Sequence, residues 1–224
     1  VFTSDNGGVS SGDAFATSNL PLRGGKGRQW EGGIREPYYV LAPGVTEAGS
    51  TCDTPVTGAD FYPTLLELVG APLRPEQHMD GRSIVPLLDG EPINARDLYW
   101  HYPHYGNQGG EPCTIIRSGD WKLIHYWEDG RDELYNIEED EVEQNDLAAL
   151  QTEIRDAMRA KIDAWVVEVD ANLPYPNPKY DAELAVRQQE SQLTNRLPSL
   201  ERQAENFLSP EFTPNPTWWG ATVD

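Results

Sequence analysis

The 224-residue sequence predicts an α/β fold, and three observations lead to that class. Short runs of β-branched and aromatic residues near the N-terminus end in polar turns, as strands do. Apolar residues recur at helical spacing over residues 60–69 and again over 147–169. Between these two segments, four short apolar runs separated by turn residues predict a small antiparallel sheet. We therefore expect an α/β region, followed by a small antiparallel sheet with a packed helix.

The N-terminal part predicts two strands joined by a long loop. The first, at residues 1–3, stops at a polar turn that presents Asp5 and Asn6, so we expect the chain to begin in the middle of a fold, as a fragment or processed product does. Residues 9–37 are rich in Gly and Ser and predict a loop of a length that compact domains usually keep for function. The apolar run at 38–42 is typical of a buried strand.

The helix over residues 60–69 tolerates Pro63 in its first turn and ends at Gly70, and we expect its apolar face in the core. The strands of the small sheet fall near 98–102, 114–117, 121–127 and 133–136, with hairpin loops at 118–120 and 128–131. The helix over 147–169 closes this subdomain with one apolar face. The parts predicted are residues 1–95, residues 96–170, and a Pro/Asn/Gln-rich tail over 171–224 that wraps the body or is partly disordered.

The charge balance excludes some partners. Lys and Arg number 17 against 37 Asp and Glu, a formal charge of −20 that would repel nucleic acid and anionic lipid. No apolar run approaches the ~18 residues of a membrane-spanning helix. The two cysteines, Cys52 and Cys113, permit one disulfide or two free thiols, and the sequence does not choose between them.

Two loops carry the candidate chemistry. Asp5 and Asn6 offer two hard oxygen ligands that suit Ca²⁺ or Mg²⁺, although turns of this composition are commoner without a metal. Residues 23–37 concentrate four cations, and glycines on both sides of Lys26 let backbone approach an anion closely. A nucleotide-binding P-loop is absent because Gly27 follows Lys26 where Ser or Thr would be needed. The alternative for this loop is a flexible basic segment that pairs with acidic neighbours.

Together these loops resemble the sulfatase family, the formylglycine-dependent sulfuric ester hydrolases that share the alkaline-phosphatase-like fold. The segments that carry the resemblance run in the family's order: Phe2-Thr3-Ser4-Asp5-Asn6-Gly7-Gly8, Leu22-Arg23-Gly24-Gly25-Lys26-Gly27, Trp30-Glu31-Gly32-Gly33-Ile34-Arg35-Glu36-Pro37, Asp60-Phe61-Tyr62-Pro63-Thr64-Leu65-Leu66-Glu67-Leu68, Asp80-Gly81-Arg82-Ser83, Gly119-Asp120-Trp121-Lys122-Leu123-Ile124 and Glu133-Leu134-Tyr135-Asn136. The resemblance implies that the first part of the chain is the end of an alkaline-phosphatase-like sandwich, and that the small antiparallel sheet with its helix is the family's C-terminal subdomain.

The resemblance also implies roles for single residues. Asp5 and Asn6 match ligands of a divalent cation, usually calcium, and Lys26 matches the lysine that contacts the sulfate. Sulfate-ester cleavage builds negative charge on oxygen, which a cation and a lysine stabilise. Glu31 and Arg35 have no assigned chemistry, and we expect them to brace the loop through an ion pair.

The family's nucleophile comes from a Cys-x-Pro/Ala-x-Arg segment, and neither Cys52 nor Cys113 lies in one. We therefore expect this chain to be the C-terminal portion of a sulfatase, inactive alone, with the formylglycine and further metal ligands outside it. The alternatives are a non-catalytic carbohydrate- or calcium-binding module, or a phosphatase or phosphodiesterase of the same fold.

Three histidines are candidate substrate ligands. His101 and His104 lie among aromatic residues before a Gly-rich turn, where rings line sugar or aryl pockets, and His78 is similar to a cleft-edge position. For each of them the alternative is structural packing. The expected substrate is a small-molecule or carbohydrate sulfate ester, and acidity together with the family's frequent export predicts a periplasmic or secreted enzyme.

Overall fold

The computed structural model describes residues 1–9, 18–106, 108–207 and 209–213. These residues form two compact units, one made of 1–9 and 18–174 and one that begins at Tyr175. Part of the predicted loop over 9–37 and the end of the predicted tail lie outside the described residues. The α/β class predicted from the sequence is confirmed.

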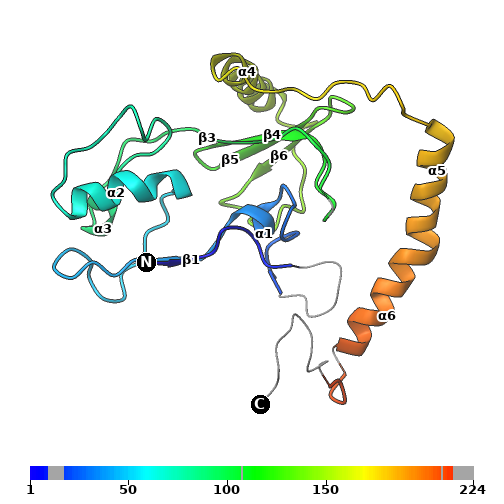
Figure 1. The fold of residues 1–224 in the computed structure, drawn as a ribbon, viewed down its shortest axis with the longest axis horizontal. Helices are drawn as coiled ribbons and strands as arrows, with labels where there is room; N and C mark the ends of the chain where they lie inside the picture. Colours follow the sequence, from blue (N-terminus) through cyan, green and yellow to red (C-terminus); the bar gives the residue numbers. More distant parts are fainter. Residues whose placement is uncertain (10–17, 107, 208, 214–224) are drawn as a thin grey trace. The chain divides into compact units, whose positions relative to one another are not determined.

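A four-stranded antiparallel sheet lies at the centre of the first unit (Figure 1). Its strands follow the chain in the order β3-β4-β5-β6 and comprise β3 (Leu98–Tyr102), β4 (Cys113–Ser118), β5 (Trp121–Tyr126) and β6 (Asp132–Asn136). The β4–β5 turn pairs Ser118 with Trp121, and Gly119 has a φ of 58°, which favours glycine. The predicted meander and both of its hairpin loops are confirmed.

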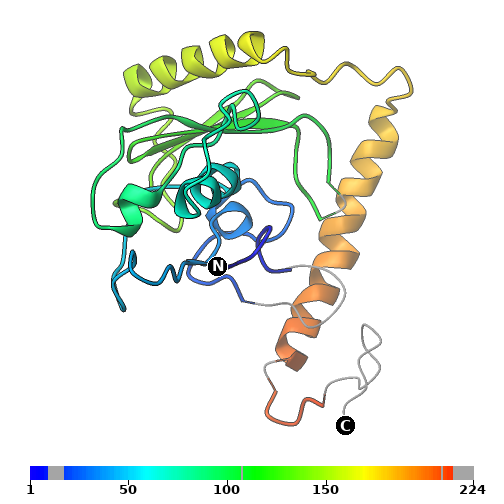
Figure 2. The same ribbon diagram turned by 60° about the vertical axis from the view of Figure 1, so that its left-hand side comes forward.

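The helix α4 (Thr152–Glu168) covers one face of this sheet (Figures 1 and 2). Because successive side chains of a strand point to opposite faces, alternate strand residues reach the helix. The apolar core on this side consists of Ile116, Leu123 and Leu134 from the strands and Met158, Ile162 and Val166 from α4. The predicted helix over 147–169 is shorter in the structure, since it begins only at Thr152, and Leu150 before it is 77% exposed.

The opposite face is covered by a four-residue helix, α1 (Glu31–Ile34), and the loop before it. Trp30 and Ile34 pack here on a second core formed by Cys113, Ile115, Ile124, Tyr126, Tyr135 and Ile137. The loop predicted over 9–37 therefore contains a helical turn that sequence periodicity missed. Because both faces are covered, the central strands β4 and β5 are buried along most of their length.

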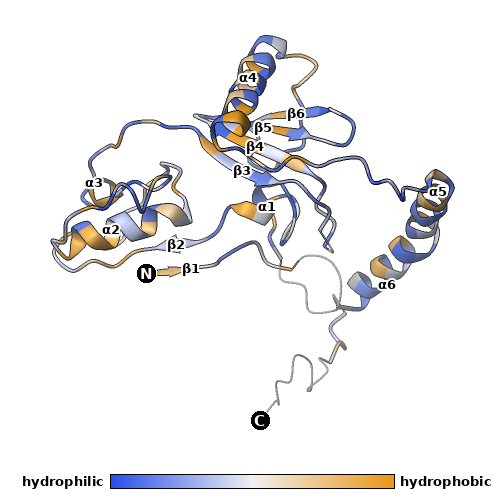
Figure 3. Ribbon diagram, turned by 45° about the horizontal axis from the view of Figure 1, so that its top comes forward, coloured by the Kyte–Doolittle hydropathy of each residue, from blue (hydrophilic) through white to orange (hydrophobic). Residues whose placement is uncertain are grey.

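The remaining elements of this unit are short: β1 (Phe2–Thr3), β2 (Tyr38–Tyr39), the 3₁₀ turn η1 (Gly58–Asp60), α2 (Phe61–Leu68) and α3 (Val85–Leu88). β1 and β2 pair antiparallel. The predicted buried strand over 38–42 is wrong in length and burial, since β2 has two residues and Leu41 is 78% exposed. The predicted helix matches α2, but Phe61 and Leu65 are exposed, and its buried residues are Pro63 and Thr64. The ribbon of α2 carries both hydrophobic and hydrophilic positions (Figure 3).

A buried carboxylate organises the segment around α2. Asp60 is completely buried, accepts hydrogen bonds from the backbone N–H of Thr57 and Arg82 at 2.8 Å each, and pairs with Arg96. Thr64 extends the network, because its hydroxyl accepts from the backbone N–H of Ile84 at 3.0 Å. Polar contacts, more than apolar burial, therefore hold α2 and α3 in this unit.

The described residues of the second unit include a run of consecutive helices. It contains α5 (Ala182–Ser191), the π-helical turn η2 (Gln192–Arg196) and α6 (Leu197–Phe207). The side chain of Asp181 caps α5 by accepting from the backbone N–H of Leu184 at 2.9 Å. The tail predicted over 171–224 therefore contains regular helices, which its composition did not indicate. None of the helices in the described part of the chain has the length and apolarity needed to cross a bilayer.

Candidate functional site

The loop that carries Asp5 and Asn6 is joined to the loop that carries Lys26 by backbone hydrogen bonds. Gly7 N–H donates to Gly33 O at 3.2 Å, and Lys26 N–H donates to Gly8 O at 3.0 Å. Asn19 strengthens the junction, because its side chain accepts from Gly8 N–H at 3.0 Å and donates to Gly8 O at 2.9 Å. The three residues predicted as metal and sulfate ligands are therefore brought onto adjoining loops.

Glycine is required where these loops cross. A Cβ atom on Gly7 would lie 2.1 Å from Gly32 O, and one on Gly33 would lie 2.1 Å from Arg28 O. No side chain fits at such distances from backbone atoms. The Gly-rich composition of the loop is therefore explained by close backbone packing.

Lys26 is exposed and forms no ion pair with any described residue. Two other cations of the same loop are engaged. Arg23 donates to Tyr135 Oη at 3.0 Å and lies 3.8 Å from the centre of the Trp30 ring, and Arg28 donates to Gly109 O at 2.6 Å. Arg23 therefore fixes the loop on β6 and Arg28 fixes it on the β3–β4 loop, and the Lys26 ammonium is left available for an anion.

Glu31 and Arg35 both form ion pairs that brace the loop, but each pairs with a residue outside the loop. Glu31 pairs with Lys122 of β5 at 2.9 Å, and Arg35 pairs with Glu141 at 3.4 Å. Arg35 and Glu141 are each about half exposed, so their pair is worth little, whereas the Glu31 pair is buried. Both contacts tie the loop to segments about 100 residues further along the chain.

Glu36 adds a second carboxylate near Asp5. Its Oε1 atom is buried and has no hydrogen-bond partner among the described residues. Burial, and then the negative charge of Asp5, raise the pKa of the Glu36 carboxyl. Two carboxylates that repel each other create a potential that favours a cation.

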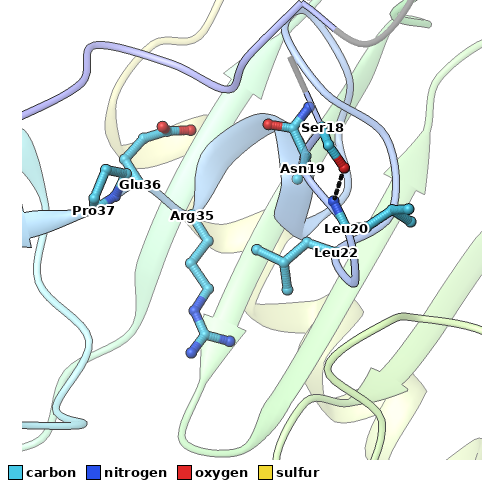
Figure 4. A pocket seen from close by; sticks show the side chains of 8 residues that line it. Ser18, Asn19, Leu20, Leu22, Arg35, Glu36 and Pro37 are labelled. Carbon is cyan, nitrogen blue, oxygen red and sulfur yellow. Dashed lines mark hydrogen bonds between the residues drawn. The ribbon is translucent and has the colours of Figure 1, made fainter. Parts of the chain in front are cut away.

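A cavity of about 310 Å³ lies beside Glu36 (Figure 4). Its walls come from the end of α1 and from the segment before the Lys26 loop: Ser18, Asn19, Leu20, Leu22, Gly32, Arg35, Glu36 and Pro37. In Figure 4 the side chains of Arg35 and Glu36 point in different directions. No group of three or more His, Cys, Asp or Glu side chains in the described parts of the chain is arranged to hold a metal ion.

The strand period separates the histidines of β3 and its following loop. His101 faces α4, with Nδ1 2.7 Å from Thr114 Oγ1 and Nε2 2.9 Å from Asn172 O. Tyr102 faces the other side, and the exposed His104 ring lies against it, tilted by 46° with the ring centroids 3.9 Å apart. His104 therefore lies on the loop whose Gly109 contacts Arg28, whereas both ring nitrogens of His101 are occupied within the fold.

His78 lies elsewhere, after α2. Its Nε2 accepts from Arg74 N–H at 3.1 Å, and its Nδ1 lies 3.2 Å from Gly81 O. Both of its nitrogens thus have partners within its own turn.

The two cysteines are free thiols. Cys113 is buried on β4, and burial raises the pKa of its thiol from 9.0 to about 12. A thiol of that pKa is neutral at physiological pH and is a poor nucleophile.

Sequence reasoning missed Lys122, Glu143 and Glu36 as parts of this region. Lys122 lies in an alternating strand, and Glu143 in a strongly acidic stretch typical of solvated loops. Of the three residues, only Lys122 could have been found from the sequence. It lies two residues before Ile124 in an alternating strand, so both side chains point to the same, covered face.

Comparison with known proteins identifies the family. Residues 26–168 match the family described as N-sulphoglucosamine sulphohydrolase, C-terminal. A sulfatase of Formosa agariphila is 36% identical over 202 residues, which cover 79% of this chain and 36% of that protein. Human steryl-sulfatase is 39% identical over 107 residues, covering 45% of this chain and 18% of that protein. The chain thus spans about a third or less of the length of these relatives.

A solved structure gives the same result. The structure of Ps i-CgsB in complex with k-i-k-neocarrahexaose superposes with a TM-score of 0.60 and 27% identity, over 87% of this chain and 41% of that one. Family match, relatives and fold agree, and the chain belongs to the sulfatases, of which it represents a C-terminal portion.

Proposed function

We propose that this chain is part of an enzyme that hydrolyses sulfate esters, and that Lys26 holds the sulfuryl group during the reaction. The observation that carries the proposal is the exposed ammonium of Lys26 on a loop that is fixed at both ends. A backbone hydrogen bond from Lys26 to Gly8 joins this loop to the loop that carries Asp5 and Asn6. In the overall reaction, water adds to sulfur, the S–O bond to the alcohol breaks, and alcohol, sulfate and a proton are released.

Lys26 contributes electrostatically. Negative charge grows on the sulfuryl oxygens and on the leaving oxygen as the bond breaks, and a preorganised ammonium stabilises it more in the transition state than in the ground state. Arg23 and Arg28 keep the loop on the sheet, so little reorganisation accompanies the reaction.

Calcium is the proposed metal, with magnesium as the alternative, and Asp5 and Asn6 would hold it through their side-chain oxygens. The residues fit a cation because Glu36 places an unpartnered buried carboxylate oxygen near Asp5. When bound, such an ion supplies positive charge to the sulfuryl oxygens. Further ligands and the formylglycine nucleophile belong to parts of the protein outside this chain.

The proposed substrate is a sulfated carbohydrate. His104 is exposed on the β3–β4 loop, whose Gln108 and Gly109 lie against Gly27 and Arg28, so a sugar ring bound there would be near Lys26. The structural relative Ps i-CgsB binds a neocarrahexaose, which supports this class. His101 and His78 were further candidates, and their ring nitrogens already have partners. Export to the periplasm or the exterior fits such a substrate.

The test measures sulfate release by the full-length protein. We expect inorganic sulfate from an aryl sulfate or a sulfated oligosaccharide, and at least 100-fold lower turnover of the matched aryl phosphate. The 224-residue chain assayed alone should release none. Preference for the phosphate ester would identify the phosphatase alternative, and binding of sulfated sugar without any hydrolysis would identify the binding-module alternative.

A further inference from the structure

Three charged side chains meet in the interior between the Lys26 loop and the sheet. Lys122 Nζ lies 2.9 Å from Glu31 Oε1 and 2.8 Å from Glu143 Oε1. Lys122 and Glu143 are fully buried, and Glu31 is 6% exposed. We call Lys122, Glu31 and Glu143 the buried triad.

Each member comes from a different segment of the chain. Lys122 is on β5, Glu31 is the first residue of α1, and Glu143 follows β6 (Figure 1). Glu143 Oε2 also accepts the backbone N–H of Glu31 at 2.5 Å, so the triad holds the main chain of α1 as well as its side chain.

The backbone of Glu143 is in an unfavourable conformation. Its φ is 54°, a region that residues other than glycine rarely adopt. Arg23, from the Lys26 loop, donates to Glu143 O at 2.9 Å, so the residue is held from both its backbone and its carboxylate. Strain of this kind persists where the surrounding structure determines it, and it is concentrated at functional sites.

Stability alone does not explain the triad. Two carboxylates and one ammonium are removed from water here, and replacing such buried charges with apolar groups is often neutral or stabilising. Burial raises the pKa of Glu143, and the charge of Lys122 opposes that shift. A buried set of charges forms only in one arrangement of the segments that carry it. It therefore fixes the position of α1 relative to the sheet.

The position of α1 also determines the position of Lys26, because a short loop with several internal hydrogen bonds connects the two. Arg28 N–H donates to Gly25 O at 2.9 Å, and Gly33 N–H donates to Trp30 O at 2.8 Å. Gly32 N–H donates to Arg23 O at 2.8 Å, which closes the loop around Lys26. A displacement of Glu31 would therefore shift the whole loop.

We propose that Lys122, Glu31 and Glu143 are positioning residues that fix the Lys26 ammonium at the sulfuryl group from the far side of its loop. This inference rests on the proposed function of Lys26.

The experiment is a mutant cycle in the full-length protein. The neutral triple variant Lys122→Met, Glu31→Gln and Glu143→Gln keeps the size of the side chains and removes all three charges together, so no buried charge is left unpaired. We expect kcat for aryl sulfate to fall about 10- to 100-fold with KM changed less than threefold, because displacement of a catalytic group by about 1 Å costs on that order. In the Lys26→Ala background the same triple change should lower kcat less than threefold, since residues that act through one group are not additive.

A control is the more exposed ion pair between Lys161 and Asp97, also 2.8 Å long, which lies on the α4 side. Lys161→Met with Asp97→Asn should leave kcat within about twofold. Hydrogen exchange gives a readout independent of activity: amides of residues 24–34 should exchange faster in the triple variant, and amides of β4 should not.

The results distinguish the positioning role of the buried triad from the proposed function of Lys26. Unchanged exchange and kcat in the triple variant would overturn the inference, and so would an equal loss of kcat with and without Lys26. If the parent protein hydrolyses no sulfate ester, the proposed function fails, and the exchange measurement still decides whether the triad anchors the loop.

Discussion

Burial on both sides of β4 changes the chemistry of the Cys113 thiol. Its pKa of about 12 leaves ~10³-fold less thiolate at pH 8 than an ordinary cysteine of pKa 9.0 would have. We expect iodoacetamide at pH 8 to leave Cys113 unmodified in the folded protein and to modify it after unfolding in guanidinium. Because the folded-state pKa is raised, the thiol's contribution to stability is complete below pH 9 and is lost as the pH rises toward 12. Modification of the folded protein at the rate of a free thiol would contradict this account.

The crossing of the two candidate loops depends on single glycines. Gly33→Ala places a methyl group 2.1 Å from Arg28 O, so the backbone must move, and we expect a loss of about 1–3 kcal/mol in the free energy of unfolding. Gly58→Ala is the control, because a Cβ there meets nothing within 4 Å and its φ is not in the left-handed region. Chemical denaturation of both variants gives the comparison. Equal effects would show that the close approach at Gly33 does not constrain the loop.

The helix α4 contributes to the core through one stripe of its surface. Ile162 is fully buried against the sheet, whereas Val167 on the same helix is 80% exposed. Ile162→Ala should lower the free energy of unfolding by about 2–5 kcal/mol, and Val167→Ala by less than about 0.5 kcal/mol. Urea denaturation measures both. A loss at Val167 as large as that at Ile162 would mean that the helix packs through its other face.

Elements with strong local patterns were predictable from the sequence. The meander follows from alternation and glycine turns, and α2 and α4 follow from apolar residues at helical spacing. α1 was not predictable, because Glu31-Gly32-Gly33-Ile34 contains two poor helix formers and depends on contacts with Glu143 and Trp30. α5 and α6 were not predicted because the tail was interpreted from its overall Pro- and Gln-rich composition, and not from the spacing of its apolar residues.

At the scale of the whole molecule, the candidate site joins residues far apart in the sequence. The roles of Asp5, Asn6 and Lys26 were predicted through family resemblance, and the structure brings their loops together. The partners of Glu31 lie 91 and 112 residues away, in an alternating strand and in an acidic stretch, and no local pattern links them. Tertiary packing alone creates these pairs.

Calcium dependence tests the proposed metal site. Chelation with EDTA should abolish sulfate release by the full-length protein, and added Ca²⁺ should restore it. Ca²⁺ should also raise the Tm of the unmodified protein and of the control Asp89→Ala, but not that of Asp5→Ala. An Asp5→Ala variant stabilised by Ca²⁺ to the same extent would place the metal elsewhere.

We propose that Lys26, held by the sheet and its own loop, stabilises the sulfuryl group of a sulfate ester. Steady-state kinetics of the full-length protein with Lys26→Ala, on a chromogenic aryl sulfate, tests it most directly. We expect kcat to fall by about 10² to 10³, as for the loss of one preorganised electrostatic group, with Tm unchanged because the side chain is exposed. A loss of less than threefold in both kcat and kcat/KM would show that Lys26 does not stabilise the sulfuryl group.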